Sequence, residues 1–499
     1  MAERNPQMMT LGQLLPDINL PTAVAGIPIA GLALDSRQIR AGQVFIAVRG
    51  SVSHGIAYVD DALRNGAVCV LTDQFAGTLG ELAVPLVVVT DLAAKVSAIA
   101  GQFFGMPSAT MDVIAVTGTN GKTTTASLLA DLLARVTSRR AGYIGTLGSG
   151  EVGQLAPGSM TTPDAVETQR LLAGFKANGL SYAVLEASSH ALDQARLAAV
   201  NTRCAVFTNL TRDHLDYHGS MASYRAAKEK VFQLPGITSA VLNIDDAAGL
   251  DLAGSLPATL ICWTYSIRRD AVAPSPLRHV LVESIGLAAT GSQVRIHSSF
   301  GTQSVDSPLV GEFNASNLAA IIASALALGL SWSAIIAAIP TLHQVPGRLQ
   351  RVGDAKPVVY VDYAHTPDAL EKALHVLRPI TRGKLWCVFG CGGDRDRGKR
   401  PLMGAVAEQC ADVVVLTSDN PRGEQPAAIV EDIRAGMHRD VHVELDRAAA
   451  IGYAVNHAAA DDVVLIAGKG HEKTQQIGPR IVPFDDVVVV AQAQQERRS

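Results

Sequence analysis

Gly118-Thr119-Asn120-Gly121-Lys122-Thr123 separates an apolar, strand-like run at Val113–Thr117 from an amphipathic, helix-like run at Thr123–Arg135. Glycines in such a loop let backbone N–H groups turn inward around phosphate oxygens, and the N-terminus of the following helix adds to the attraction. Lys122 can neutralise the β- and γ-phosphates, and the Thr123 hydroxyl can bind Mg²⁺. A plain tight turn is the alternative, and the loop is shorter than the usual G-x-x-x-x-G-K-[ST] pattern. Glycines, lysine and hydroxyl together favour a nucleotide-phosphate site.

The segments after this loop continue the alternation of strands and helices. Strands that alternate with helical patterns indicate βαβ units, and therefore a mainly parallel, doubly wound sheet. An alternating pattern at Leu281–Ser298 predicts a hairpin attached to this core. Further buried strands are predicted at Tyr182–Glu186, Cys204–Asn209 and Ser239–Asn243.

The chain has 499 residues, which is enough for about three domains. Gly105-Met106-Pro107-Ser108 predicts a linker, and Pro346-Gly347 opens the last block. We therefore expect an α/β protein with a small N-terminal α/β domain (1–108), a central doubly wound domain with the phosphate loop (109–343) and a C-terminal Rossmann-like open sheet (344–499). The outer blocks contain strand-like runs at Val44–Val48, Ala67–Thr72, Pro85–Val89, Val358–Tyr363, Leu385–Gly390, Val413–Ser418 and Val463–Gly468, and a helix-like run at Leu92–Phe104.

Composition narrows the functional classes. The net charge of −4 gives no basic footprint, so nucleic acid is not an expected partner. The six cysteines form no disulfide-like framework, which favours a reducing cytoplasm. No apolar run is long enough to span a bilayer, and Met1–Met9 lacks the apolar run of a signal peptide, so no membrane partner is expected either.

Polar side chains stand where two strands of the central block end. Glu186 ends one strand, and Asn209 ends the next and precedes Thr211–Gly219, which contains His214. Because the carboxyl ends of parallel strands meet at one edge, a carboxylate and a histidine there favour a metal site beside the phosphate loop. A helix-capping role for Glu186 and a turn position for His214 are the alternatives.

Six segments occur in one order: Thr117-Gly-Thr-Asn-Gly-Lys-Thr-Thr124, Glu186-Ala-Ser-Ser-His190, Asn209-Leu-Thr-Arg-Asp-His-Leu-Asp-Tyr-His-Gly219, Tyr224-Arg-Ala-Ala-Lys228, Gly311-Glu-Phe-Asn-Ala-Ser-Asn317 and Asp362-Tyr-Ala-His-Thr-Pro-Asp368. Together they resemble the Mur ligases of peptidoglycan synthesis and their relatives, the folylpolyglutamate synthetases. The resemblance extends over the whole chain. It implies an ATP-dependent ligase that joins a carboxylate to an amine through an acyl phosphate.

The resemblance implies a catalytic centre with Lys122 and two Mg²⁺ ions. Thr123, Glu186 and His214 would be metal ligands, and Lys228 would be a carbamylated lysine (N6-carboxylysine), formed from CO₂ and supplying an anionic oxygen ligand. From spacing alone, Lys228 in Lys228-Glu229-Lys230 is an ordinary lysine on a charged helix face. The implied ATP-binding residues are Gly118, Thr119, Asn120, Gly121, Lys122, Thr123, Thr124, Asn317, Arg348 and Asp362, with His365 nearby.

The resemblance also implies a site for a UDP-muramoyl-peptide, divided between the first two blocks. Leu34-Asp35-Ser36-Arg37 is similar to the family's uridine-binding segment. The following loop, Gly50-Ser-Val-Ser-His-Gly55, departs from the more usual Asp-Gly-His arrangement. The implied contact residues are Leu34, Ser36, Thr161, Thr162, Ser188, Gln194 and Arg196.

Three segments of the last block resemble the branch of the family that adds meso-2,6-diaminopimelate: Gly390-Cys-Gly-Gly-Asp-Arg-Asp-Arg-Gly-Lys-Arg-Pro401, Asp419-Asn-Pro-Arg-Gly-Glu424 and Gly468-Lys-Gly-His-Glu472. Diaminopimelate differs from lysine by a second amino acid head group with a carboxylate. The guanidinium groups of Arg395 and Arg422 suit that carboxylate. A plain β-turn at Asp419-Asn420-Pro421-Arg422 is the alternative. The remaining candidates are Asp419, Asn420 and Glu472, which can accept from the distal ammonium, Pro421 of the same segment, and Gly468, which offers backbone.

We therefore expect a monomeric cytoplasmic enzyme that adds meso-diaminopimelate to UDP-N-acetylmuramoyl-L-alanyl-D-glutamate with ATP. A lysine-adding ligase or another ligase of the Mur or folylpolyglutamate type is an alternative of the same class. A nucleotide switch that only hydrolyses ATP, or a non-catalytic binding module, is an alternative from a different class. The base that deprotonates the incoming amine is not identified by the sequence.

Overall fold

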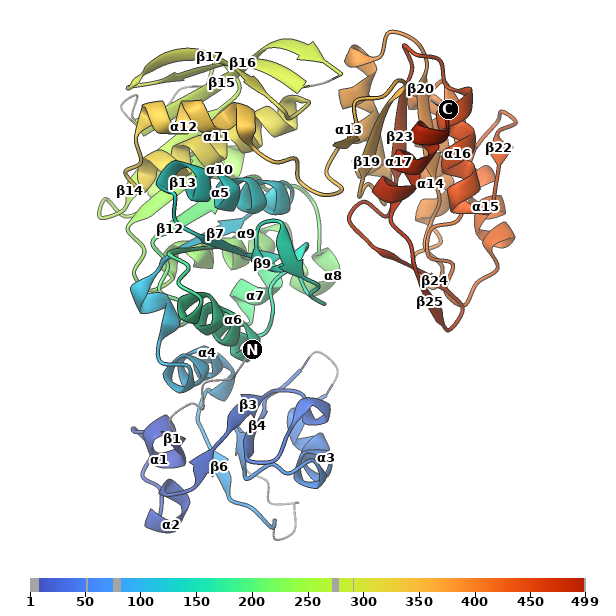
Figure 1. Cartoon of the computed structure of the whole chain (residues 1–499). Helices are drawn as coiled ribbons and strands as arrows, with labels where there is room; N and C mark the ends of the chain where they lie inside the picture. The colour runs from blue at the N-terminus through green and yellow to red at the C-terminus, as the bar shows by residue number, and fades with distance from the viewer. Residues whose placement is uncertain (1–8, 51–52, 75–81, 272–277, 290, 498–499) are drawn as a thin grey trace. The chain divides into compact units, whose positions relative to one another are not determined.

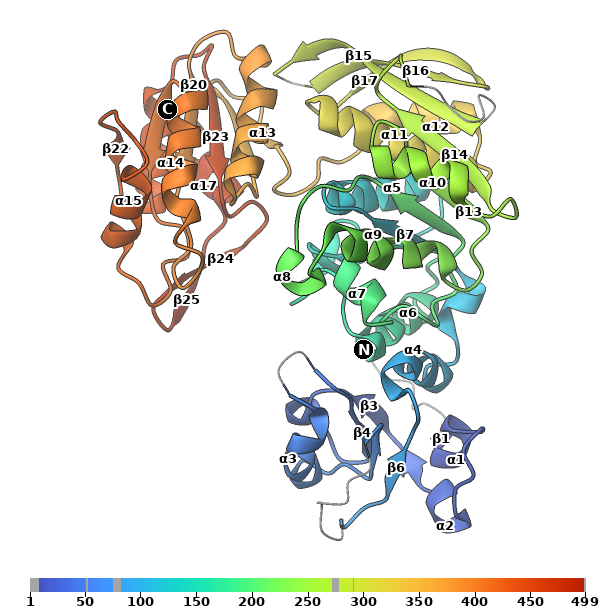
Figure 2. The same cartoon turned by 180° about the vertical axis from the view of Figure 1, so that it is seen from behind.

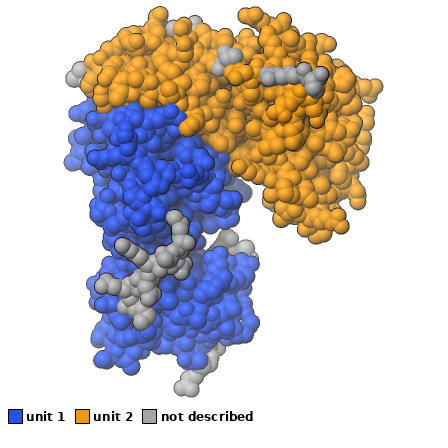
Figure 3. Space-filling view, in the orientation of Figure 1, with its two compact units in different colours: residues 1–264, 272–278, 323–330 blue, residues 265–271, 279–322, 331–499 orange. Residues whose placement is uncertain are grey.

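The computed structural model describes residues 9–50, 53–74, 82–271, 278–289 and 291–497 (Figures 1 and 2). Ser51 and Val52 of the predicted uridine-side loop lie outside the described residues. The chain divides into two compact units (Figure 3). The first consists of residues 1–264, 272–278 and 323–330, and the second of residues 265–271, 279–322 and 331–499.

The N-terminal part of the first unit is a four-stranded parallel sheet in the order β3-β4-β5-β6. All residues of β5 are buried, which explains why its sequence has an apolar run, Cys69–Leu71, rather than an alternation of apolar and polar residues. The elements are β1 (Met9–Thr10), α1 (Leu11–Leu14), α2 (Thr22–Ala25), β2 (Pro28–Ile29), β3 (Gly31–Ala33), β4 (Gln43–Ala47), α3 (Val59–Arg64), β5 (Cys69–Thr72), β6 (Leu86–Val88) and α4 (Leu92–Phe103).

The rest of the first unit is built on the sheet order β8-β11-β7-β12-β13, in which all neighbours are parallel. Helix α5 starts directly after the loop that follows β7 and is buried along most of its length. The elements are β7 (Asp112–Thr117), α5 (Lys122–Thr137), β8 (Ala141–Gly145), β9 (Gly148–Glu151), β10 (Gln154–Ala156), α6 (Ala165–Ala177), β11 (Tyr182–Glu186), α7 (Ser189–Asp193), β12 (Cys204–Phe207), α8 (Leu215–His218), α9 (Met221–Glu229), β13 (Ser239–Asn243), α10 (Ala247–Ser255) and β14 (Ile261–Ser266).

The second unit begins with three antiparallel strands and ends with a six-stranded sheet in the order β18-β19-β23-β20-β21-β22. Only β18 of these six is antiparallel to its neighbour. The elements are β15 (His279–Ala288), β16 (Gly291–Ser298), β17 (Gly301–Ser307), α11 (Glu312–Ala327), α12 (Trp332–Ala338), β18 (Gln350–Val352), β19 (Val358–Asp362), α13 (Pro367–Leu377), β20 (Leu385–Phe389), α14 (Lys399–Cys410), β21 (Val413–Leu416), α15 (Pro426–Arg434), β22 (His442–Val443), α16 (Arg447–His457), β23 (Val463–Ala467), β24 (Thr474–Ile477), β25 (Arg480–Pro483) and α17 (Asp486–Glu496).

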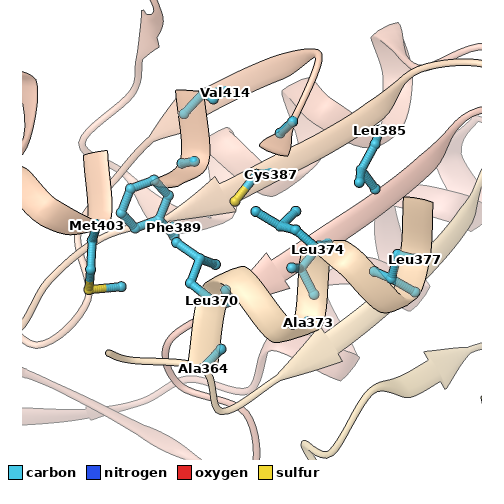
Figure 4. Packing of buried hydrophobic residues seen from close by; sticks show 14 of the residues in the cluster. Ala364, Leu370, Ala373, Leu374, Leu377, Leu385, Cys387, Phe389, Met403 and Val414 are labelled. Carbon is cyan, nitrogen blue, oxygen red and sulfur yellow. The ribbon is translucent and has the colours of Figure 1, made fainter. Parts of the chain in front are cut away.

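Helices cover both faces of the six-stranded sheet. Along β20, Cys387 and Phe389 pack with α13, α14 and α15, whereas Trp386 and Val388 pack with α16 and α17. Figure 4 shows Leu370, Leu374 and their neighbours on α13 packed against the first of these faces. Successive side chains of a strand point to opposite faces, so a strand covered on both sides must be apolar throughout.

The predicted fold class is confirmed: a small α/β part, a doubly wound and mainly parallel central sheet, and an open α/β sheet at the C-terminal end. The predicted hairpin at Leu281–Ser298 corresponds to β15 and β16, but β17 adds a third strand that the sequence did not predict. The domain boundaries after residues 108 and 343 stay predictions. No described helix is long and apolar enough to cross a membrane.

Truncating Leu374 to alanine should leave a cavity in the core shown in Figure 4, because this side chain is completely buried. We expect the free energy of unfolding of the second unit to fall by about 2–5 kcal/mol. Chemical denaturation or scanning calorimetry would measure the change. Leu402→Ala on α14 is the control: its side chain is 58% exposed, and a change within about 0.5 kcal/mol is expected. Equal losses in both variants would contradict the assigned core.

Candidate active site

The phosphate loop is shaped by two glycines with positive φ. Gly118 has φ +144° and Gly121, which precedes the first turn of α5, has φ +83°. A Cβ at Gly118 would lie 1.9 Å from Thr208 Oγ1, so a side chain at this position would be both strained and obstructed. The first backbone N–H groups of α5 have no partner within the helix and can therefore face an anion.

Two residues directly after β12, Thr208 and Asn209, form hydrogen bonds to the phosphate loop. Asn209 accepts from the backbone N–H of Thr119 through its carbonyl (2.8 Å) and from that of Asn120 through Oδ1 (2.9 Å). Thr208 Oγ1 donates to the Asn120 carbonyl at 2.6 Å. Lys122 Nζ folds back over the loop and donates to the carbonyls of Gly118 and Thr119, both at 2.9 Å. The loop is therefore fixed, with its ammonium group in place.

Glu186 lies at the end of β11 and is completely buried. Oε1 accepts from Tyr143 OH (2.5 Å) and from the backbone N–H of Thr146 (2.8 Å). Oε2 accepts from Thr123 Oγ1 (3.0 Å) and from Thr146 Oγ1 (3.3 Å). The structure therefore joins the hydroxyl of the phosphate loop and the predicted carboxylate directly. The capping alternative is wrong, because Ser188, not Glu186, caps α7.

Lys228 is the clearest departure from the interpretation based on spacing alone. Its side chain on α9 is buried, Nζ donates to the Gly118 carbonyl at 2.6 Å, and Nζ lies 4.4 Å from the centroid of the Tyr224 ring. Burial, together with the positive charge of Lys122, lowers the pKa of Lys228 to about 6, although Asp213 opposes the shift. The surface-lysine alternative is therefore wrong, and the amine is mainly neutral at pH 7.

His214 precedes α8 in a left-handed conformation (φ 51°). Its ring lies edge-on to that of His190, with the centroids 4.9 Å apart, and 6.0 Å from the centroid of Tyr224, the residue that also contacts Lys228. His214 is half-exposed, with Oδ2 of Asp213 3.6 Å from Nε2. Among the residues that the structure describes, no three His, Cys, Asp or Glu side chains form a ready-made metal cage. A cation here would need oxygen ligands from other sources.

The predicted residues for the muramoyl-peptide form one hydrogen-bonded group near the end of β11. Thr162 Oγ1 donates to the Glu186 carbonyl (2.6 Å) and contacts Ser188 Oγ (3.1 Å). Arg196 donates to Gln194 Oε1 (2.7 Å) and to the Thr162 carbonyl (2.7 Å). Thr161 Oγ1 joins the group through Thr146 Oγ1 at 3.0 Å. Leu34 and Ser36, in contrast, lie in the N-terminal sheet region, where Ser36 is buried and Leu34 packs on its core.

In the second unit, Asp362 ends β19. Its carboxylate accepts from the backbone N–H groups of Leu349 (2.6 Å) and Ala364 (2.8 Å), and burial raises its pKa against the effect of Arg348. The guanidinium group of Arg348 stacks 4.9 Å from the centroid of Tyr363. His365 Nδ1 donates to the Tyr363 carbonyl at 2.7 Å. Asn317 is buried on α11 and donates to Asn314 Oδ1 at 3.1 Å.

The predicted amino acid motif forms a cluster at the ends of β21 and β23. Asn420 Nδ2 donates to Glu472 Oε2 at 2.8 Å. Arg422 has φ +50° and donates from Nη1 to the Gly393 carbonyl at 2.9 Å. Arg422 Nη1 and Arg395 Cγ lie 2.9 and 3.6 Å from the position that a Cβ on Gly392 would occupy, so the two arginines are neighbours. A solvated β-turn does not describe this segment.

Three glycines around the motif lie too close to neighbouring atoms to be replaced by a residue with a side chain. A Cβ on Gly468 would lie 2.6 Å from Asp419 Oδ2, and Asp419 is buried, which raises its pKa. A Cβ on Gly470 would lie 2.7 Å from Tyr363 Cβ, and one on Gly347 would lie 2.3 Å from the His471 nitrogen. The segment after β23 therefore crosses two other chain segments at backbone distance.

Two buried cations near the motif were not predicted from the sequence. Arg447 on α16 pairs with the fully buried Asp486 (2.7 Å) and donates to the carbonyls of Ser418 and Ala467 at the ends of β21 and β23. Lys469 is buried between Gly468 and Gly470 and contacts Asn420 and Glu472. The available signal for Lys469 was a lysine flanked by glycines directly after a buried strand.

The doubly wound sheet, the phosphate loop and the buried acid beside it define a nucleotide-binding α/β protein with a second α/β unit. Three family models match the chain: the Mur ligase family catalytic domain (28–103), the Mur ligase middle domain (116–325) and the Mur ligase glutamate ligase domain (347–470). The chain belongs to the Mur ligase family.

Similar proteins extend over almost the whole chain. A protein of Alkalilimnicola ehrlichii named UDP-N-acetylmuramoyl-L-alanyl-D-glutamate–2,6-diaminopimelate ligase is 48% identical over 93% of this chain and 95% of its own length. A protein of the same name from Pseudomonas aeruginosa is 46% identical over 96% of both chains. A solved structure with this name is 36% identical, with a TM-score of 0.72, and covers 99% of this chain and all of its own.

Replacing Gly118 with alanine should disrupt the phosphate loop, because the new Cβ would collide with Thr208 and force a strained φ. We expect nucleotide affinity to fall by at least about tenfold, corresponding to about 1.4 kcal/mol. Isothermal titration with ATP or ADP and Mg²⁺ would measure this. Gly174→Ala, in the middle of α6 with open space around it, should leave affinity unchanged. Wild-type affinity in Gly118→Ala would show that the loop does not bind phosphate.

Proposed function

We propose that the chain is an ATP-dependent ligase that adds meso-2,6-diaminopimelate to UDP-N-acetylmuramoyl-L-alanyl-D-glutamate in peptidoglycan synthesis. The observation that carries this proposal is near-full-length identity of 45–48% to ligases named for this reaction. The cluster of Asn420, Arg422 and Glu472 in the second unit supports the same amino acid substrate.

The reaction begins with attack of the glutamyl carboxylate on the γ-phosphorus of ATP, which breaks the bond to the β-phosphate oxygen and releases ADP. Lys122 lies over the loop that would hold the phosphates and would neutralise charge that builds up on them. The product is an acyl phosphate. The neutral amine then attacks its carbonyl carbon, and collapse of the tetrahedral intermediate releases phosphate and forms the amide.

Two Mg²⁺ ions fit the donor chemistry of the first unit. The Glu186 carboxylate and the Thr123 hydroxyl are adjacent oxygen donors at the loop. The half-exposed His214 imidazole contacts the Tyr224 ring, which also contacts Lys228. Bound Mg²⁺ would offset the negative charge of the phosphates and of the attacking carboxylate. Glu186 would then exchange some of its present hydrogen bonds for metal ligation.

Lys228 is proposed to act as its carbamate. Its neutral amine can add CO₂ with release of one proton, which converts a buried base into an anionic oxygen donor. Because the folded-state pKa lies near 6, this amine is available at neutral pH, unlike that of an exposed lysine. Burial beside Gly118 would place the new carboxylate oxygens close to the phosphate loop.

The remaining assignments follow from this function. The muramoyl-peptide would bind the group around Thr162 and Arg196, with its uridine end toward Leu34 and Ser36. In the second unit, Asn317, Arg348 and Asp362 would contact the nucleotide. The free thiols of all six cysteines are compatible with a reducing cytoplasm. We further propose a monomer with the three domains 1–108, 109–343 and 344–499, since the three family matches each fall within one of them.

Phosphate release tests the reaction class and the amino acid together. With ATP and the muramoyl-dipeptide present, release should require meso-diaminopimelate, and L-lysine should support a rate lower by a factor of at least about 100. The reason is that lysine would leave the carboxylate site at Arg422 unfilled. A preference for lysine would select the lysine-adding alternative. Equal release without either co-substrate would select the nucleotide switch.

Labelling tests the carbamate. Protein equilibrated with ¹³C-bicarbonate should show one carbamate carbon by NMR, and Lys228→Ala should lack it and lose at least about 99% of the activity, as expected when a metal ligand is removed. Lys230→Ala is the matched control, because Lys230 is half-exposed and its ammonium group pairs with Asp193 on the surface. It should keep both the label and the activity. Full activity in Lys228→Ala would refute the carbamate role.

A further inference from the structure

We propose that Lys469 is a positioning residue that, directly and through Asn420, fixes Glu472 as the acceptor for the distal ammonium group of the amino acid substrate. This inference rests on the proposed function, because it concerns the same amino acid site. If the inference holds, the buried Lys469 is needed for the enzyme to distinguish diaminopimelate from an analogue that lacks only the distal amino group.

The ammonium group of Lys469 has three acceptors for its three protons. Nζ lies 2.7 Å from the Thr474 carbonyl, 3.0 Å from Glu472 Oε2 and 3.2 Å from Asn420 Oδ1. The side chain is completely buried. A buried charge is tolerated only when it is paired and fully hydrogen-bonded, and Lys469 meets both conditions. Its donors are used up by the protein, so it acts on the substrate only through other residues.

Lys469 determines which way the Asn420 amide faces. Asn420 Oδ1 accepts from Lys469 Nζ and from the backbone N–H of Gln476 at 2.9 Å. Two donors on this side exclude the flipped amide, because its NH₂ group would then face an N–H and an ammonium. Nδ2 is therefore directed to Glu472 Oε2, at 2.8 Å.

Glu472 is held by one oxygen only. Oε2 accepts from both Asn420 Nδ2 and Lys469 Nζ, whereas the described part of the chain provides no hydrogen bond to Oε1. Burial opposes ionisation of Glu472, but the charge of Lys469 and the hydrogen bonds from Asn420 and Lys469 lower its pKa. The result is an ionised carboxylate with a fixed plane and an open acceptor oxygen.

Arg422 provides the complementary half of the site. Nη1 is bound to the Gly393 carbonyl, and the described residues give Nε and Nη2 no partner, so one edge of the guanidinium can take a carboxylate in a bidentate manner. The backbone of Arg422 is paired with β24 through the Gln476 carbonyl (3.1 Å). Asn420 is bound to the same residue, so one hairpin positions both the cationic and the anionic halves.

The test compares meso-diaminopimelate with 2-aminopimelate, which retains the distal carboxylate but lacks the distal amino group. In the wild type, kcat/KM should favour diaminopimelate by at least about tenfold, the worth of a hydrogen bond to a charged group. Lys469→Met keeps the length of the side chain and removes its charge. We expect it to reduce this preference by about tenfold or more while KM for ATP stays unchanged. Lys473→Met is the matched control, since Lys473 is exposed in the same segment, and it should retain the wild-type preference.

The outcomes separate the possible roles. A merely structural role of Lys469 would lower the activity on both substrates equally, and an unchanged preference in Lys469→Met would overturn the inference. If Lys469→Met does not fold, Lys469→Gln replaces it, because the amide still donates hydrogen bonds but carries no charge. A reduced kcat/KM preference for diaminopimelate over 2-aminopimelate in this variant would support the inference, and an unchanged preference would overturn it. A wild-type protein that does not use diaminopimelate at all would instead remove the proposed function, and this inference with it.

Discussion

Parallel pairing of buried strands is the constraint on which both candidate sites depend. Register pairs Glu186 with Val116 and Phe207 with Thr117, so the ends of three strands meet beside the phosphate loop. The same rule in the second unit gathers the ends of β19, β21 and β23. A parallel sheet needs helical crossovers on its faces, and these crossovers cover the strands and leave only their ends open to substrates.

The buried groups at the strand ends differ between the two candidate sites. Around the phosphate loop, an acid with four donors and a lysine with a lowered pKa create a place where anionic oxygen can be concentrated. Around Asn420, a fully hydrogen-bonded lysine lies beside an arginine whose Nε and Nη2 have no partner among the described residues, and these charges suit the binding of a zwitterion. The first arrangement suits charge neutralisation during phosphoryl transfer, and the second suits selection of the incoming amine.

Much of the fold was predictable because buried strands have a simple signature. Tyr182–Glu186 and Ser239–Asn243 were predicted with the bounds that the structure has. β17 was missed because its residues are mostly exposed and polar, so no apolar alternation marks it. Lys228 could not be recognised from spacing, since it is buried against the phosphate loop and its hydrogen-bond partner, the Gly118 carbonyl, lies 110 positions earlier. Lys469 was missed because its partner Asn420 lies 49 positions earlier, and because its contacts with Glu472 and Thr474 depend on a turn that no apolar pattern marks.

The glycine crossing after β23 limits how this protein can evolve. Gly347 and Gly470 lie so close to neighbouring backbone that any side chain would push two segments apart. The two residues that flank Lys469, Gly468 and Gly470, therefore tolerate almost no substitution. Under the proposed function, a change of amino acid substrate could be met more easily at the more accessible residues, Arg395 and Arg422, than at these glycines. Substitutions that alter the choice of amino acid are therefore expected at Arg395 and Arg422, and not at the buried Lys469 and the glycines beside it.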